Sequence, residues 1–136
     1  MTEAKTVSFS MPGGAGAAAI ARRSVISIEV GLPLGVRHRV ALMLSELVAN
    51  AVQHGGARPT EVVEVRVAST PARVRVEVVD PGWQGVEPPR RIQHPDGGYG
   101  LLLVEHLSHE WGRESTATGG SLAWFELDLD GLQEAY

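Results

Sequence analysis

A carboxylate and an amide lie one helical turn apart in an otherwise apolar stretch of the sequence. Glu46 and Asn50 occur within SELVANAVQHGG, and between Val40 and Val52 the only other polar residue is Ser45. Side chains at this spacing share one face of a helix. Polar groups on a helix that is apolar nearly all round need partners, because burial without hydrogen bonds is costly. The spacing alone leaves open both a ligand site and a solvated face.

Two further segments carry groups that suit a nucleotide. Asp80 ends an alternating segment and precedes Gly82, so its carboxylate could accept a hydrogen bond from a ligand amino group while glycine permits close approach. Gly98 and Gly100 precede a helical pattern, and the free N–H groups of a helix N-terminus attract phosphate. Each segment also fits an ordinary turn or hinge. The sequence contains no P-loop motif.

Composition restricts the classes of function. The 136 residues are 43% hydrophobic and 21% charged, which is ordinary for one globular domain. The net charge of −4 provides no basic field for nucleic acid or an anionic membrane. The absence of cysteine excludes disulfides and thiolate metal sites and favours a reducing cytoplasm. No apolar run reaches the roughly 18 residues of a membrane span, and the histidines show no metal-site spacing.

The elements that must hold these groups follow from the periodicity. Helical patterns extend over about 15–30 and, after Pro33, over about 34–54. TEVVEVRVAS and ARVRVEVVD alternate and predict an antiparallel hairpin that turns at TPA. A third helix is predicted in YGLLLVEHLSHEW, a second hairpin in GRESTATGGSLAWFELDL, and a short edge strand in TVSFSM.

Helices that alternate with hairpins predict an α+β fold in which one sheet carries helices on one face. A single domain is expected over residues 1–136. Trp111 and Trp124 follow apolar runs and are predicted to lie in the core. Residues 81–98 are rich in proline and glycine without periodicity, which is typical of a functional or disordered loop.

Taken in order, these segments resemble the nucleotide-binding boxes of the Bergerat-fold (GHKL) ATPases, the superfamily of gyrase B, heat-shock protein 90 and histidine kinases. LSELVANAVQHG and GLLLVEHLSHEWG are most similar to anti-sigma-factor serine kinases and related actinobacterial ATP-binding regulators. The similarity extends from about Arg22 to Leu129, and the combination is far more specific than any one segment. It implies a two-layer Bergerat fold with a mixed, mostly antiparallel sheet.

The resemblance also implies a role for each group. Asn50 would hold the Mg²⁺ that bridges the ATP phosphates, and Glu46 would be the general base. Asp80 would bind the adenine amino group, with Gly82 making room for the base and Ser121 close by. The phosphate cradle would comprise Gly98, Gly100 and Leu101, beside an ATP lid at residues 86–97. DPGWQG departs from the usual pattern, because Gln84 stands at the second glycine position.

By this resemblance the protein is a cytoplasmic serine/threonine protein kinase that uses Mg²⁺ and ATP. It would bind a sigma factor and phosphorylate an anti-sigma antagonist. The branch commonly forms homodimers, so the resemblance allows a homodimer here too. The alternative is a nucleotide-binding or degenerate module that regulates a partner by contact alone. Glu46 together with Asn50 favours the kinase, since a contact module has no use for a base. A sensor histidine kinase core is less favoured, because no phosphoacceptor helical hairpin precedes the domain.

Overall fold

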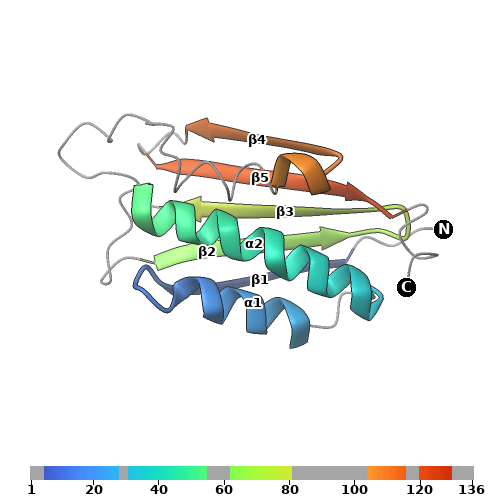
Figure 1. Cartoon of the computed structure of the whole chain (residues 1–136), viewed down its shortest axis with the longest axis horizontal. Helices are drawn as coiled ribbons and strands as arrows, with labels where there is room; N and C mark the ends of the chain where they lie inside the picture. Colours follow the sequence, from blue (N-terminus) through green and yellow to red (C-terminus); the bar gives the residue numbers. More distant parts are fainter. Residues whose placement is uncertain (1–4, 28–30, 55–61, 81–103, 116–119, 130–136) are drawn as a thin grey trace.

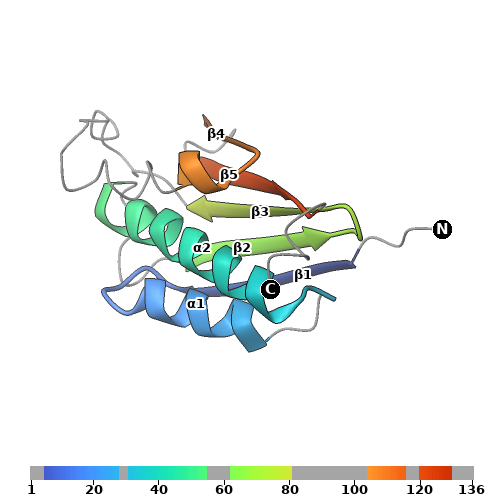
Figure 2. The same ribbon diagram turned by 45° about the vertical axis from the view of Figure 1, so that its right-hand side comes forward.

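The computed structural model describes residues 5–27, 31–54, 62–80, 104–115 and 120–129. Two long helices and five strands form two layers, with the helices covering one face of the sheet (Figures 1 and 2). The helices are α1 (Ala17–Ser27) and α2 (Leu34–His54), and residues 104–107 are also helical. The strands are β1 (Lys5–Pro12), β2 (Val62–Ser69), β3 (Arg73–Asp80), β4 (Glu110–Ser115) and β5 (Ser121–Asp128). The predicted α+β fold is confirmed.

The sheet has the strand order β1-β2-β3-β5-β4, and all four pairings are antiparallel. The first hairpin, β2–β3, turns at residues 70–72 as predicted, and β1 forms an edge as predicted. The chain then places β5, not β4, beside β3. This non-sequential neighbour brings Asp80, the last residue of β3, into register with Ser121, the first residue of β5.

The core lies between α2 and the inner face of the sheet. Val36, Val40, Leu44, Leu47 and Val48 recur at helical spacing on α2 and are almost completely buried. Alternate residues of the strands meet them, namely Val63, Val65, Val67, Val74, Val76, Val78, Phe125 and Leu127. Fully burying a side chain of this size contributes about 1.5–3 kcal/mol, so this interface fixes where α2 lies on the sheet.

A side chain of α2 holds the end of α1. Nη1 of Arg37 donates a 2.8 Å hydrogen bond to the carbonyl of Ile26. The last carbonyls of a helix have no partner within the helix, so this bond satisfies one of them. The carbonyl of Pro33 accepts a 2.9 Å bond from the Arg37 amide and begins α2 at the predicted position. The contact places the C-terminal end of α1 beside the N-terminal end of α2.

The outer face of the sheet carries a ladder of ion pairs. Arg75 bonds to Glu77 at 2.9 Å and to Glu126 at 2.7 Å, and Arg73 bonds to Glu126 at 2.8 Å. The guanidinium of Arg75 lies 4.3 Å from the ring centroid of Trp124. Trp124 is therefore on the outer face, and its predicted place in the core is wrong. Strand alternation explains this, because the buried neighbours Ala123 and Phe125 take the inner face.

Two predicted boundaries also differ from the structure. The third helical pattern was expected to run to Trp111, but β4 begins at Glu110. Trp111 pairs across the sheet with Phe125. It is partly buried and packs against the core, which agrees with the predicted core position of this residue. Tertiary pairing with β5 thus overrides the local helical pattern. α1 begins at Ala17 rather than at about residue 15, and residues 28–30 of the predicted span lie outside the described ranges.

None of the helices in the described ranges is long and apolar enough to cross a membrane.

Candidate functional site

The sequence-predicted residues that the structure describes gather at one end of the two layers. The C-terminal half of α2, the end of β3 and the start of β5 all lie at this end (Figure 1). They carry Glu46 and Asn50, Asp80, and Ser121 respectively. The antiparallel sheet produces this grouping, because β5 starts where β3 ends.

Asn50 is a buried amide whose hydrogen-bonding capacity is not fully used. Its side chain is 7% exposed, and Nδ2 has no hydrogen-bond partner within the described part of the chain. Leu47, Val48 and Ala51 supply the buried stripe of this part of α2. An unsatisfied buried polar group costs roughly 1–3 kcal/mol, so an amide in this state favours a ligand that completes it. The solvated-face explanation of Asn50 is thereby excluded.

Glu46 lies one turn before Asn50 on the same side of α2 and is half-buried. Met43 is buried on one side of it, whereas Leu42 is exposed on the other. A carboxylate in this position is partly shielded yet open to an approaching group. Ser45 is not part of the arrangement, since its hydroxyl donates a 2.7 Å bond to the carbonyl of Leu42 within the helix.

Asp80 is a buried carboxylate with a defined partner. It is 4% exposed, and the hydroxyl of Ser121 donates a hydrogen bond to its Oδ2. An ionised carboxylate has only acceptor sites, so the pair offers acceptor capacity to a ligand amino group. The direct bond between Asp80 and Ser121 was not predicted. No sequence signal could have given it, because the two residues lie far apart in the chain and meet through the β3–β5 register.

The remaining predicted site residues lie outside the described ranges. These are Gly82, Gly98, Gly100, Leu101 and the lid at 86–97.

The sequence resemblance implies a bound Mg²⁺, which needs oxygen ligands from the side chains of this site. The described residues contain no group of three or more His, Asp or Glu side chains able to hold a metal. Mg²⁺ suits a site with few protein ligands, because it retains water and phosphate oxygens. The amide oxygen of the buried Asn50 is of the kind that suits this cation, so Asn50 could serve as its single protein ligand.

The sequence model of the family described as histidine kinase-like ATPase domain matches residues 14–124. The chain belongs to this family. The match includes both long helices, the first hairpin, β4 and the first residues of β5. It therefore contains Glu46, Asn50, Asp80 and Ser121.

Solved structures agree with the family assignment. The blue-light activated histidine kinase of Erythrobacter litoralis EL346 is 25% identical, with a TM-score of 0.58, and the alignment covers 90% of this chain and 43% of that one. The separately solved histidine kinase domain of the same protein is 24% identical, with a TM-score of 0.57 and coverages of 90% and 64%. This ATPase domain thus spans less than two thirds of either chain. No curated protein matches it.

Membership gives the domain a general type of function. A histidine kinase-like ATPase domain is an ATP-binding unit with a regulatory role, and Mg²⁺ is typical of such domains. The acceptor of the phosphoryl group and the protein partners are not fixed by membership.

Proposed function

We propose that this ATPase domain is a serine/threonine protein kinase of the anti-sigma-factor type. The observation that carries the proposal is the pairing of Glu46 with Asn50 on one face of α2, where Asn50 is buried and Glu46 is half-buried. A metal-binding amide beside an accessible carboxylate is the pair that phosphoryl transfer needs. One group holds the phosphates and the other accepts the proton of the nucleophile.

In the proposed reaction the Glu46 carboxylate takes the proton of a serine or threonine hydroxyl. The hydroxyl oxygen forms a bond to the γ-phosphorus of ATP, and the bond from that phosphorus to the bridging oxygen of ADP breaks. ADP leaves with the electron pair, and the acceptor becomes a phosphoester. The Mg²⁺ held by Asn50 would neutralise phosphate charge. Positioning and charge neutralisation supply most of the rate in such transfers.

Asp80 would select the nucleotide. Its carboxylate accepts from the adenine amino group, and the bond from Ser121 holds it in place. Guanine carries a carbonyl at the corresponding position and offers no donor there, so the site would prefer ATP to GTP. Gly82 would make room for the base, and Gly98, Gly100 and Leu101 would line the phosphates beneath the lid at 86–97.

The proposed setting is the cytoplasm. The proposed partners are a sigma factor that the protein binds and an anti-sigma antagonist that it phosphorylates. These partners rest on the sequence resemblance of LSELVANAVQHG and GLLLVEHLSHEWG to the anti-sigma-factor kinases.

The decisive variant is Glu46→Gln, which keeps the size of the side chain and removes the base. Mg-ATP affinity should stay within a few-fold while kcat falls by roughly 10²–10⁴, the usual contribution of a positioned base. Glu110→Gln, an exposed carboxylate at the other end of β4 in register with Glu126, is the matched control and should leave kcat unchanged. Normal transfer by Glu46→Gln would refute the role of Glu46.

The chemistry of the product separates the remaining alternatives. A phosphoserine or phosphothreonine survives acid, whereas a phosphohistidine does not. An acid-labile label would point to the activity named for the Erythrobacter protein. Tight binding of a sigma factor with no transfer to any antagonist would favour a regulator that acts by contact alone.

A further inference from the structure

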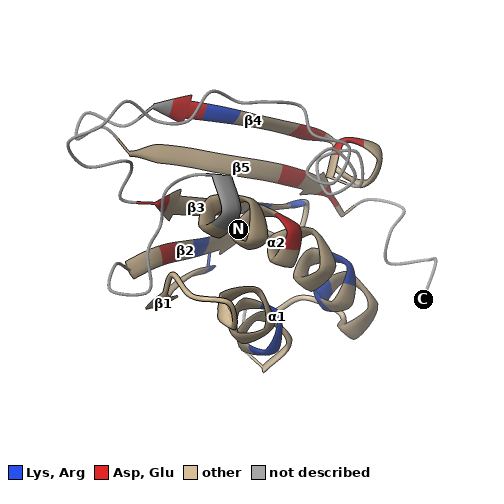
Figure 3. Cartoon of the chain, turned by 60° about the vertical axis from the view of Figure 1, so that its left-hand side comes forward, with Lys and Arg blue, Asp and Glu red and all other residues tan. Residues whose placement is uncertain are grey.

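The two long helices carry positive charge that their own residues do not balance. α1 and α2 contain Arg22, Arg23, Arg37 and Arg39, whereas Glu46 is their one acidic residue. The whole chain has a net charge of −4. Figure 3 shows basic segments in blue on both helices, which cover the inner face of the sheet. The ion pairs of Arg73 and Arg75 lie on the outer face. The helical layer is therefore basic on an acidic protein.

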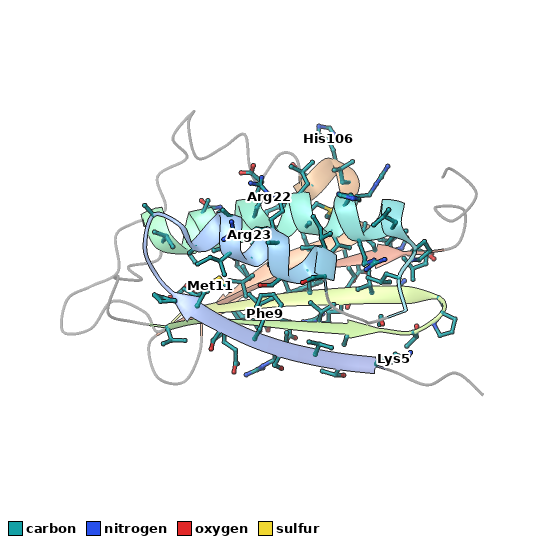
Figure 4. All side chains as sticks on the ribbon, turned by 90° about the horizontal axis from the view of Figure 1, so that it is seen from below. Lys5, Phe9, Met11, Arg22, Arg23 and His106 are labelled. Atoms are coloured by element: carbon teal, nitrogen blue, oxygen red, sulfur yellow. The ribbon has the colours of Figure 1, made fainter. Side chains whose placement is uncertain are left out.

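Two of these arginines differ from those of the sheet. Arg66, Arg73 and Arg75 each form ion pairs with glutamates. Arg22 and Arg23 are exposed on α1, and no carboxylate of the described residues lies within 4.0 Å of them. Figure 4 shows both on α1, above β1. Their charge is available to a partner.

A ridge on α2 leads from this charge toward the site. Leu34, His38, Leu42 and Glu46 recur at four-residue intervals and thus follow one line along the helix. Leu34 is 55% exposed and Leu42 is 42% exposed, and His38 between them is also exposed. Leu34, Leu42 and Val62 on β2 are the only strongly exposed large hydrophobic residues in the described ranges. Apolar surface of this kind, next to a site, is typical of an interaction surface.

Arg22 lies beside this ridge. The bond from Arg37 to Ile26 shows where the antiparallel helices α1 and α2 meet. A helix rises about 1.5 Å per residue, so one turn away from this contact along both helices brings Arg22 level with Ala41, the neighbour of Leu42 in the chain. Arg22 is exposed on α1 and Leu42 is exposed on the neighbouring α2, so the two residues lie at a similar height along the helix pair, and Leu42 is one turn from Glu46.

We propose that the acceptor protein docks through an acidic segment on the Leu42 surface, which is formed by Arg22, Arg23, Leu34, His38 and Leu42. The proposal rests on the kinase function above and adds the chemistry of its substrate. Carboxylates of the segment pair with Arg22 and Arg23, and an apolar side chain covers Leu42. The serine or threonine of the same segment then lies within reach of Glu46, which takes its proton as the oxygen bonds to the γ-phosphorus and ADP leaves.

The test uses two fluorescein-labelled peptide pools and the full chain without nucleotide. One pool carries serine, leucine and several glutamates in random order, and the matched pool has glutamine in place of glutamate. Anisotropy should show the acidic pool binding roughly three- to thirtyfold more tightly at low salt, as expected for two exposed ion pairs. Added salt should remove this preference, because exposed charges are screened.

Variants locate the surface. Arg22→Gln combined with Arg23→Gln should abolish the preference for the acidic pool, and Leu42→Gln should weaken both pools. Arg73→Gln, which removes an arginine from the outer face of the sheet, is the matched control and should keep the preference. Because Arg22, Arg23 and Leu42 are exposed, unfolding midpoints should change little.

Equal binding of the two pools, or a preference that survives in the Arg22→Gln/Arg23→Gln variant, would overturn the docking proposal. Adding Mg-ATP then tests the kinase separately. The docking proposal is upheld if the double variant loses the preference for the acidic pool. If the wild type also transfers no phosphoryl group to the serine of that pool, the proposed catalytic function is refuted.

Discussion

The hydroxyl of Ser121 on β5 donates a hydrogen bond to the carboxylate of Asp80 on β3, directly across the sheet. Asp80 is almost completely buried, so its orientation depends on the partners the fold supplies. The bond links the end of one hairpin to the start of the next, at the end of the sheet covered by the C-terminal half of α2. If Asp80 selects the nucleotide as proposed, its orientation is set by the register between β3 and β5.

Replacing Asp80 by asparagine should weaken ATP binding roughly 10- to 100-fold, the equivalent of losing a charged hydrogen bond worth about 1.5–3 kcal/mol. The amide can turn a donor toward the adenine amino group, where an acceptor is needed. Calorimetry with ATP and GTP measures both affinities. If GTP binds the wild type as well as ATP does, Asp80 does not recognise adenine.

Ser121→Ala should reduce ATP affinity less than Asp80→Asn, by roughly three- to tenfold, because it leaves the carboxylate in place but removes one hydrogen bond that orients it. The same change should lower the free energy of unfolding by about 1 kcal/mol. Ser27→Ala is a suitable control, because the Ser27 hydroxyl bonds only within α1. Unchanged ATP affinity in Ser121→Ala would mean that Asp80 is held by its other contacts.

Asn50→Ala should abolish the Mg²⁺ dependence of ATP binding while leaving the fold intact. The substitution removes a buried amide whose Nδ2 lacks a partner within the described residues, so the unliganded protein loses little. Titrations of ATP with Mg²⁺ and with EDTA provide the measurement, and Ser45→Ala on the same helix is the control. Wild-type protein that binds ATP equally well in EDTA would disprove a metal role for Asn50.

Gly112→Ala should lower the free energy of unfolding by about 1–3 kcal/mol through overpacking. Trp124 lies across Gly112 in the β4–β5 register, and a Cβ at position 112 would stand 2.8 Å from Cζ2 of the indole. Urea unfolding measures the effect. The double variant Gly112→Ala/Trp124→Leu should recover much of the loss, because leucine frees the space. Full stability of the single variant would show that the indole moves aside easily.

Stability should fall in acid partly through Glu126. The hydrogen bond from Arg75 lowers the pKa of Glu126 below its ordinary value of 4.5, and Arg73 adds to this effect against the opposing influence of burial. A lowered pKa in the folded state means that the contribution is present above about pH 4.5 and is lost as pH falls through the folded-state value. Glu126→Gln should therefore be less stable than the wild type at neutral pH, and the difference should shrink in acid. A constant difference from neutral pH to pH 3 would contradict this linkage.

The sequence by itself determined the elements and much of the chemistry. Apolar residues at helical spacing specified α2 to its last residue, and alternation specified β2, β3 and β5, because each pattern has one face that can be buried. The spacing of Glu46 and Asn50 placed both on one side of a helix for the same reason. The pattern of a segment predicted its structure correctly where the apolar face of that segment is the face that the folded protein buries.

Only the tertiary structure decided which groups meet. The strand order places β5 beside β3, and this joins Asp80 to Ser121 and draws Trp111 from a helical pattern into β4. It also turns Trp124 to the outer face against Arg75, and it buries Asn50 with an unmet polar atom. Strand pairing between distant segments depends on register and on the two faces of the whole sheet. Neither of these is encoded in the periodicity of a single segment.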